Sequence, residues 1–450
     1  MIIDRYSGQH SAATPHAIAA YEVAVANVAA HRPAAAEALA AALAESPDFL
    51  GARTLQGFAA VILARSETML AAREAARDVQ ALAAALPATP QERAMTEALG
   101  HAAQGNLLRA AQRLDLHLID QPRDFLALKL SHAMRFMSGD LDGMLKTTGL
   151  VLNDWSADTP GYGFLLGCHA FGLEEAGDLR QAENYGRAAL RHEPSDAWGL
   201  HAVSHVFEMD GRTQEGVSWL DQTRPVWTRC NNFAFHMGWH LSLFQLAQGR
   251  HDLALDVYDT EVRPASTEDF RDVVNAVSLL WRMRQEQVDV GHRWHELHVI
   301  AQRRKADTTL MFTSLHHLLT MIAVGDRIGA RRVAQEIALR AASTEGDQAR
   351  VAAGAGAGVA QALLTLLNGG DAGPDLERLA AKVTDIGGSH AQRDVFYRTL
   401  ALLAADSGDR VAASALLTQR RKFRHDDRFV ALAEQRLDFA LRQQARRAVA

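Results

Sequence analysis

Glycine-centred breaks recur along this chain at nearly constant intervals. Five of them are separated by 34, 38, 34 and 38 residues: Gly105, Gly139, Gly177, Gly211 and Gly249. The series continues less regularly through three further glycines: Gly291, Gly325 and Gly408. Each break follows one helical stretch and precedes another, as glycine does when it ends a helix. A repeat of about 34 residues is typical of stacked helix pairs.

The residues between these breaks favour helices. Alanine, leucine, arginine and glutamate fill long stretches with apolar residues at helical spacing, whereas β-branched alternation is scarce. Because one helix pair cannot bury its own apolar face, successive pairs must stack on their neighbours. We therefore expect an all-α fold, an α-solenoid of stacked helix hairpins that form one superhelix over residues 1–450.

Within this single solenoid we expect three stretches of different regularity. Residues 1–90 form degenerate amino-terminal repeats, and residues 91–300 form the best-defined repeats with the candidate concave site. Residues 301–450 form divergent repeats that end in a polar capping helix, and the glycine-rich stretch 368–375 predicts a surface loop. With 48% hydrophobic and 22% charged residues, the composition is that of a globular protein.

The run LEEAGDLRQAENYGRAALRHEPSD resembles the tetratricopeptide repeat. The matching residues are those of the turn, the second helix and the closing proline: Gly177, Ala182, Tyr185, Ala189 and Pro194. This resemblance implies that the predicted hairpins are tetratricopeptide-type helix pairs.

Three blocks between residues 169 and 258 are more narrowly similar to the tetratricopeptide-repeat-protein-38 family. They are HAFGLEEAGDLRQAE, DAWGLHAVSHVFEMDGRTQEGVSWL and NNFAFHMGWHLSLFQLAQGRHDLALDVYD. Upstream, RYSGQHSA and AESPDFLGAR resemble degenerate versions of that family's amino-terminal segment. The resemblance extends loosely over most of the chain, and the carboxy-terminal third is recognised only as helical repeats. It implies a fold and no particular reaction.

Polar and aromatic side chains form a stripe in the segment AWGLHAVSHVFEMDGR. At intervals of 3, 4 and 3 residues, the stripe consists of Trp198, His201, His205 and Glu208. This spacing places all four on one face of a helix. The tetratricopeptide resemblance implies that this face lines the concave inner surface, where ligands usually lie.

The neighbouring first helices contribute similar side chains. The segment NNFAFHMGWHLSLF carries a second stripe at the same spacing, made of Asn232, His236, Trp239 and His240. The preceding helix contributes Phe171 and Glu174. Because stacked pairs lie side by side, we expect the three helices to converge, with two His-x3-His pairs 35 residues apart.

Imidazoles, carboxylates and an amide between aromatic walls are the composition of a ligand pocket. The sequence therefore predicts a solenoid binding protein for a small polar or anionic molecule or a peptide end. The predicted ligand-binding residues are Phe171, Glu174, Trp198, His201, His205, Glu208, Asn232, His236, Trp239 and His240. Neighbouring imidazoles of mixed protonation suit a carboxylate or a phosphate.

Two other functions remain open. Histidines at positions i and i+4 can share a transition metal such as zinc, and two pairs would supply four ligands: His201, His205, His236 and His240. The same histidines together with Glu208 could serve an enzyme, either a metal-dependent hydrolase or a metal-free acid–base catalyst. The third function is a protein-interaction scaffold, which predicts an apolar concave lining that the histidines contradict.

Several residues have structural interpretations. Trp198 and Trp239 could be core aromatics, and His169 lies outside the best register. Three histidines stand without polar companions and are expected to be structural or solvated: His132, His316 and His317. Nucleophilic catalysis by cysteine is disfavoured, because Cys168 and His169 point about 100° apart on a helix. Cys168 and Cys230 are too few for a disulfide framework and fit a reducing compartment.

Charge and hydropathy limit the partners. The net charge is −6 without a long basic run, so the electrostatic signature of a binder of nucleic acid or anionic membranes is missing. The chain begins without a signal-peptide pattern and contains no 18 uninterrupted apolar residues. We expect a cytoplasmic protein without nucleic-acid or membrane partners, and a homo-oligomer stays open.

Overall fold

A computed structural model describes residues 1–368, 375–424 and 427–449. The chain divides into two compact units. Unit 1 contains residues 1–206 and 222–234, and unit 2 contains residues 207–221 and 235–450. The three divisions fall within helices α11 (Ala197–Met209), α12 (Thr213–Gln222) and α14 (Phe233–Ala247). The single superhelix expected from the sequence stays a prediction, and the loop expected at 368–375 lies outside the described residues over 369–374.

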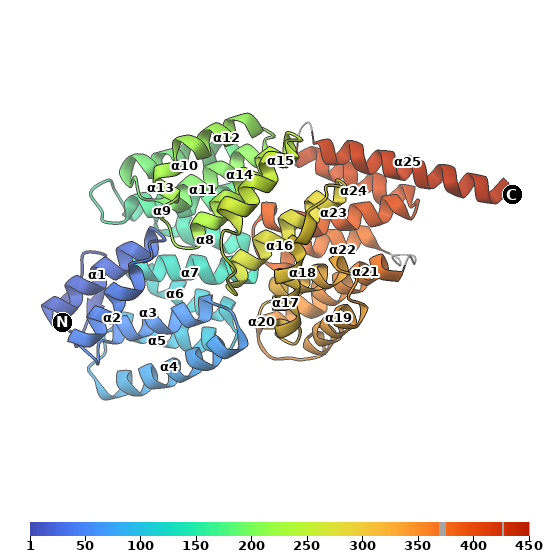
Figure 1. The fold of residues 1–450 in the computed structure, drawn as a ribbon. Coiled ribbons are helices and arrows are strands. Elements are labelled where there is room, and N and C mark those ends of the chain that lie inside the picture. The colour runs from blue at the N-terminus through green and yellow to red at the C-terminus, as the bar shows by residue number, and fades with distance from the viewer. Residues whose placement is uncertain (369–374, 425–426, 450) are drawn as a thin grey trace. The chain divides into compact units, whose positions relative to one another are not determined.

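Unit 1 is built from consecutive helices that pack on one another in chain order (Figure 1). Before α11 its helices are α1 (Pro15–Ala29), α2 (Ala35–Glu45), α3 (Leu50–Ile62), α4 (Ser66–Ala85), α5 (Pro90–Ala103), α6 (Leu107–Asp120), α7 (Phe125–Ser138), α8 (Leu141–Val151), the 3-10 turn η1 (Leu152–Asp154), α9 (Tyr162–Glu175) and α10 (Leu179–His192). The short α13 (Arg224–Trp227) belongs to the same unit. The pairs α1–α2, α3–α4, α5–α6 and α9–α10 each form a packed hairpin.

Unit 2 continues the same principle. Its elements besides α14 are α12 (Thr213–Gln222), α15 (His251–Val257), η2 (Tyr258–Val262), α16 (Phe270–Gln285), η3 (Gly291–Arg293), α17 (Trp294–Arg304), α18 (Met311–Ala323), α19 (Arg327–Ala341), α20 (Gly346–Val351), η4 (Ala352–Gly356), α21 (Ala357–Asn368), α22 (Leu376–Lys382), η5 (Val383–Ile386), α23 (His390–Asp406), α24 (Arg410–Phe423) and α25 (Arg428–Val449). Among its helix pairs, α17–α18, α18–α19 and α23–α24 pack directly. The all-α fold with sequential hairpins is confirmed.

One short strand pair departs from the helical prediction. Strands β1 (Ile2–Ile3) and β2 (Gln9–His10) are antiparallel, with Ile2 opposite His10. The turn between them is held by Asp4, whose Oδ1 accepts the backbone N–H groups of Tyr6 and Gly8. Its Oδ2 lies 2.8 Å from Nε2 of His10. A single buried carboxylate therefore closes this ladder, which hydrophobic periodicity could not indicate.

Seven of the eight glycine-centred breaks follow the end of a helix as predicted, whereas Gly291 begins the 3-10 turn η3. All eight glycines of the series have a positive φ, from 57° at Gly291 to 86° at Gly177. At four turns the next residue is an aspartate whose side chain accepts the N–H of the residue three positions on, and these caps are Asp140, Asp178, Asp326 and Asp409. Glycine thus ends one helix and aspartate starts the next within two residues.

Among the described residues, one helical segment is long and apolar enough to cross a membrane by length and composition alone. It is Gly346–Asn368, which includes α20, η4 and α21. The segment packs against α18 and α19, and core helices of water-soluble proteins meet the same criterion. A single such helix is weak support for a membrane span, so the expected location and the expected lack of a membrane partner stay predictions.

Three histidines are buried as neutral rings. Burial lowers the pKa of His132 and His316 to about 3 and the pKa of His317 to about 4. His132 packs edge-on against Phe171 and Trp198, whereas Nδ1 of His316 donates to a backbone carbonyl one turn earlier. These rings are 0 to 4% exposed, so they belong to the packed interior.

We expect Gly177→Ala to lower the free energy of unfolding by about 1 kcal/mol, because alanine is strained at a φ of 86°. No described atom lies within 4 Å of the added Cβ, so the cost is one of backbone conformation. Gly149→Ala is the matched control: it lies inside α8 with equally open surroundings and should gain about 0.5 kcal/mol. Urea unfolding measures both changes, and a shift of both variants in the same direction contradicts this assignment.

Acid should destabilise the protein through these buried histidines. The folded state binds fewer protons than the unfolded state between pH 3 and 6.5, so stability rises with pH and is lost as pH falls below 6.5. Between pH 7 and pH 5, His132 alone should cost about 2 kcal/mol. The measurement is the free energy of unfolding of wild type and His132→Phe at both pH values. An equal pH dependence of the two proteins would refute the prediction.

Candidate functional site

The histidines of α11 form a close pair in unit 1. His201 and His205 lie one helical turn apart, and their Nε2 atoms are separated by 2.9 Å. Both side chains are buried, with exposures of 1% and 0%. Asp196 caps the same helix by accepting the N–H groups of Trp198 and Gly199. The predicted stripe therefore brings two imidazoles together away from bulk water.

Two carboxylates of α9 face this pair. Oε2 of Glu174 lies 3.4 Å from Nδ1 of His205, and both groups are fully buried. Glu175 lies beside them, so that one ligand atom from each of Glu174, Glu175 and His205 lies within 4.8 Å of the other two. Glu174 is a predicted site residue, whereas Glu175 is not among the residues predicted from the sequence.

Aromatic rings surround His201 in unit 1. Phe171 stacks on it at a centroid distance of 5.5 Å, and Trp198 lies 4.9 Å away. Phe233 covers a further side at 5.3 Å. Phe171 is fully buried and belongs to a core cluster with Met144 and two alanines, while Trp198 is half-buried at its edge. The predicted aromatic walls exist, but they pack directly on the imidazole.

The turn between α1 and α2 also reaches this site, which sequence reasoning missed. His31 stacks on Phe233 at 4.3 Å and on Trp198 at 5.8 Å. Its backbone oxygen accepts the N–H of Asn231, and Arg32 donates to the oxygen of Val226. About 200 residues separate these partners in sequence, so no local pattern could have joined them.

A half-buried lysine, Lys129, lies close to Cys168 and Trp198. Nζ of Lys129 is 3.4 Å from Sγ of Cys168 and 5.9 Å from the Trp198 ring. Burial raises the pKa of the Cys168 thiol despite this lysine, and it raises the pKa of Asp196 to about 7. Burial raises the pKa of the Cys230 thiol to about 11. Neither cysteine has the lowered pKa of a nucleophile.

The second pair lies in unit 2 with its own partners. The rings of His236 and His240 are 4.8 Å apart on α14. Nδ1 of His236 lies 3.1 Å from the side-chain oxygen of Asn275, and Nδ1 of His240 lies 3.2 Å from Oε2 of Glu208. Trp239 is fully buried and donates its indole N–H to Ser278. These contacts give Trp239 the properties of a core aromatic.

Glu208 connects His240 to a cluster of charges within unit 2. Its Oε1 accepts a hydrogen bond of 2.8 Å from Arg424. A cavity of about 200 Å³ beside it is lined by charged side chains of both signs: Arg282, Arg398, Arg420, Arg424, Arg428, Glu208, Glu286, Asp394 and Asp427. Burial alone would raise the pKa of Asp394, but the guanidinium groups, Arg420 first, hold it well below its usual range.

The predicted site residues are thus divided between the units. Phe171, Glu174, Trp198, His201, His205 and the half-buried Asn232 belong to unit 1, whereas Glu208, His236, Trp239 and His240 belong to unit 2. Each histidine pair is described within its own unit, and their convergence on one pocket stays a prediction. His169, taken as structural, bonds to Thr148 at 2.9 Å and packs on Tyr185.

The cysteines should be unreactive in the folded protein. Both are buried and free, and burial raises the pKa of both thiols. In the native protein at pH 8, a chromogenic disulfide reagent should modify both thiols much more slowly than it modifies free cysteine. After denaturation, the same reagent should detect two thiols per chain. Rapid modification of Cys168 in the native protein would contradict this prediction and would support the hypothesis of nucleophilic catalysis by cysteine.

Comparison with known proteins adds little to this description. No family model matches the chain. Among solved structures, the chain is similar to the TPR domain of P58(IPK), with 15% identity, coverage of 78% of this chain and 89% of that chain, and a TM-score of 0.21. The chain's own structure consists of sequential helix hairpins with left-handed glycines near 34-residue intervals. The protein is an all-α protein of sequential helix hairpins that contains buried histidines.

Proposed function

We propose that this helical-repeat protein binds a divalent transition metal ion, such as zinc, through His201 and His205. The observation that carries the proposal is the approach of their Nε2 atoms to 2.9 Å beside buried carboxylates. Two nitrogens bound to one tetrahedral zinc at about 2.0–2.1 Å lie about 3.3 Å apart. A small rotation of either ring would therefore admit the ion.

The surroundings of His205 favour the tautomer that binds metal through Nε2. Glu174 lies next to Nδ1 and stabilises a proton there, which leaves the lone pair of the neutral ring on Nε2. A carboxylate behind a ligating imidazole is the usual support of histidine–metal sites. Glu174 is therefore a positioning residue in this proposal, and Glu175 is the nearest candidate for a further oxygen ligand.

The donor atoms also favour a transition metal cation. Imidazole nitrogens and carboxylate oxygens are common zinc ligands in proteins. One such atom from each of Glu174, Glu175 and His205 lies within 4.8 Å of the other two.

The size of the site supports an ion over an organic ligand. His201 is 1% exposed and has aromatic rings on three sides at centroid distances of 4.9 to 5.5 Å. An ion needs only the space between its ligand atoms, whereas a small molecule needs a cavity of about 300 Å³ or more. The proposal thus favours the metal alternative over the small polar or anionic ligand predicted first.

We expect protein purified without an affinity tag to bind about one equivalent of zinc by elemental analysis after equilibration and dialysis. His201→Ala and His205→Ala should each abolish this binding. His132→Phe is the matched control, because His132 is equally buried against the same rings but lies outside the pair. Retained zinc in His205→Ala, with folding verified by circular dichroism, would show that the pair is not the site.

Replacement of the positioning carboxylate gives a graded test. Glu174→Gln should weaken zinc binding about 10- to 100-fold, because an amide supports the metal-binding tautomer less well than a carboxylate. Cobalt substituted for zinc should show the strong visible absorption of a tetrahedral complex in wild type, altered in Glu174→Gln. An unchanged affinity and spectrum would remove Glu174 from the site.

The second pair separates two versions of the proposal. The four-ligand version predicted from the sequence requires His236→Ala and His240→Ala to lose the same equivalent of zinc. If both variants keep it, the metal belongs to the first pair alone and the four-ligand version is wrong. Three other predictions from the sequence stay proposals. They are catalysis by these histidines, binding of a peptide end, and the similarity of residues 169–258 to the tetratricopeptide-repeat-protein-38 family.

A further inference from the structure

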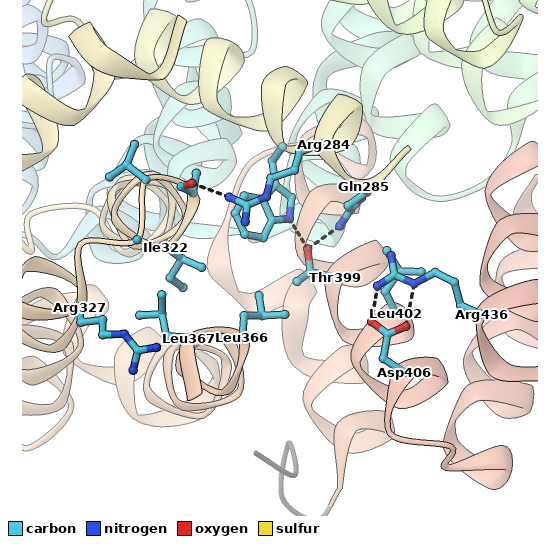
Figure 2. A pocket seen from close by; sticks show the side chains of 14 residues that line it. Arg284, Gln285, Ile322, Arg327, Leu366, Leu367, Thr399, Leu402, Asp406 and Arg436 are labelled. Atoms are coloured by element: carbon cyan, nitrogen blue, oxygen red, sulfur yellow. Dashed lines mark hydrogen bonds and ion pairs between the residues drawn. The ribbon is translucent and has the colours of Figure 1, made fainter. Parts of the chain in front are cut away.

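An open cavity of about 600 Å³ lies within unit 2 and shares no lining residue with the histidine pairs. Its walls come from α16, the turn between α18 and α19, the end of α21, α23 and α25 (Figure 2). The volume falls in the range of about 300–1,000 Å³ that is typical of small-molecule sites. The cavity is therefore large enough for an organic ligand.

The centre of the cavity is apolar and its sides are charged. In Figure 2 three aliphatic side chains occupy the middle of the view: Ile322, Leu366 and Leu367. Arg327 lies on one side of them, and the ion pair of Arg436 with Asp406 lies on the other. Leu366 is 38% exposed although it is a large apolar residue. Covering this apolar surface with an apolar group of a ligand would be favourable, because it removes the surface from water.

The polar groups of the deep wall are bonded to one another. Trp281 donates its indole N–H to Oγ1 of Thr399 at 2.9 Å, and Gln285 donates to the same oxygen at 3.0 Å. The Thr399 hydroxyl in turn donates to the backbone oxygen of Val395. Because these donors and acceptors are already paired with one another, the deep wall offers a ligand mainly the apolar surface of the Trp281 indole.

The charge of the lining is positive. Three arginines and one carboxylate line the described part of the cavity, which gives a sum of +2: Arg284, Arg327, Arg436 and Asp406. The aspartate pairs with Arg436. Arg284 donates to the neutral backbone oxygen of Ala323 and lies over the Trp281 ring. Two guanidinium groups thus face the cavity without a carboxylate in its lining to balance them.

We infer that this cavity binds a small organic anion in which a carboxylate is joined to an apolar body. The carboxylate would lie toward Arg284 and Arg327, and the body would cover the aliphatic centre. A cation would be repelled by the lining, and an inorganic anion would leave the apolar surface exposed. The site is independent of the proposed metal site, so either can fail without the other.

The test uses octanoate as the probe, with isothermal titration calorimetry on the full chain. Octanoate should bind, and butanoate should bind about tenfold or more weakly because it buries four fewer methylenes. Octyltrimethylammonium, which has an alkyl chain of similar length and the opposite charge, should not bind. Equal affinity for octanoate and the cation, or no octanoate binding at millimolar concentration, overturns the inference.

Variants locate the binding. Arg327→Gln should weaken octanoate about five- to tenfold. Arg332→Gln should not, because it changes another arginine of α19 that lies outside the cavity. Leu366→Ser should weaken octanoate about tenfold, whereas Ile328→Ser removes an apolar side chain that is 85% exposed and not in the lining. Equal effects of cavity and control variants would place octanoate elsewhere and overturn the inference.

Discussion

The two-residue turn of a left-handed glycine and a capping aspartate is the constraint on which the hairpins depend. At Gly177 and Asp178 the glycine ends α9 and the aspartate starts α10, so the chain reverses without a loop. Such a short turn forces consecutive helices to pack on each other, and it fixes which face of each remains for the next hairpin.

Local geometry was therefore the part of the site that the sequence could predict. The i, i+4 spacing places the rings of His201 and His205 one turn apart on one helix face. The 2.9 Å approach of their Nε2 atoms depends in addition on the orientation of the two rings. The glycine series was equally predictable, because only glycine adopts a φ near 80° without strain. Both inferences use interactions within one turn or one hairpin.

Contacts between distant segments could not be predicted in this way. His31 meets Phe233 across about 200 residues, and Arg424 bonds to Glu208 over a separation of 216. The residues next to an arginine or a histidine in the sequence do not indicate its distant partner. A charged residue is therefore predicted to lie on the solvated surface. The amino-terminal strand pair was missed because one carboxylate, Asp4, holds it together.

The two histidine pairs look equivalent in sequence but differ in their electrostatics. In unit 1, Glu174 lies beside a second carboxylate, Glu175, and both lie close to His205. In unit 2, the carboxylate behind His240 is Glu208, and a guanidinium group already occupies its other oxygen. We therefore propose the metal site at the first pair, where two carboxylates lie within 4.8 Å of a ring nitrogen of His205. The two histidine pairs have the same spacing in the sequence, but the fold places different charged side chains beside each pair.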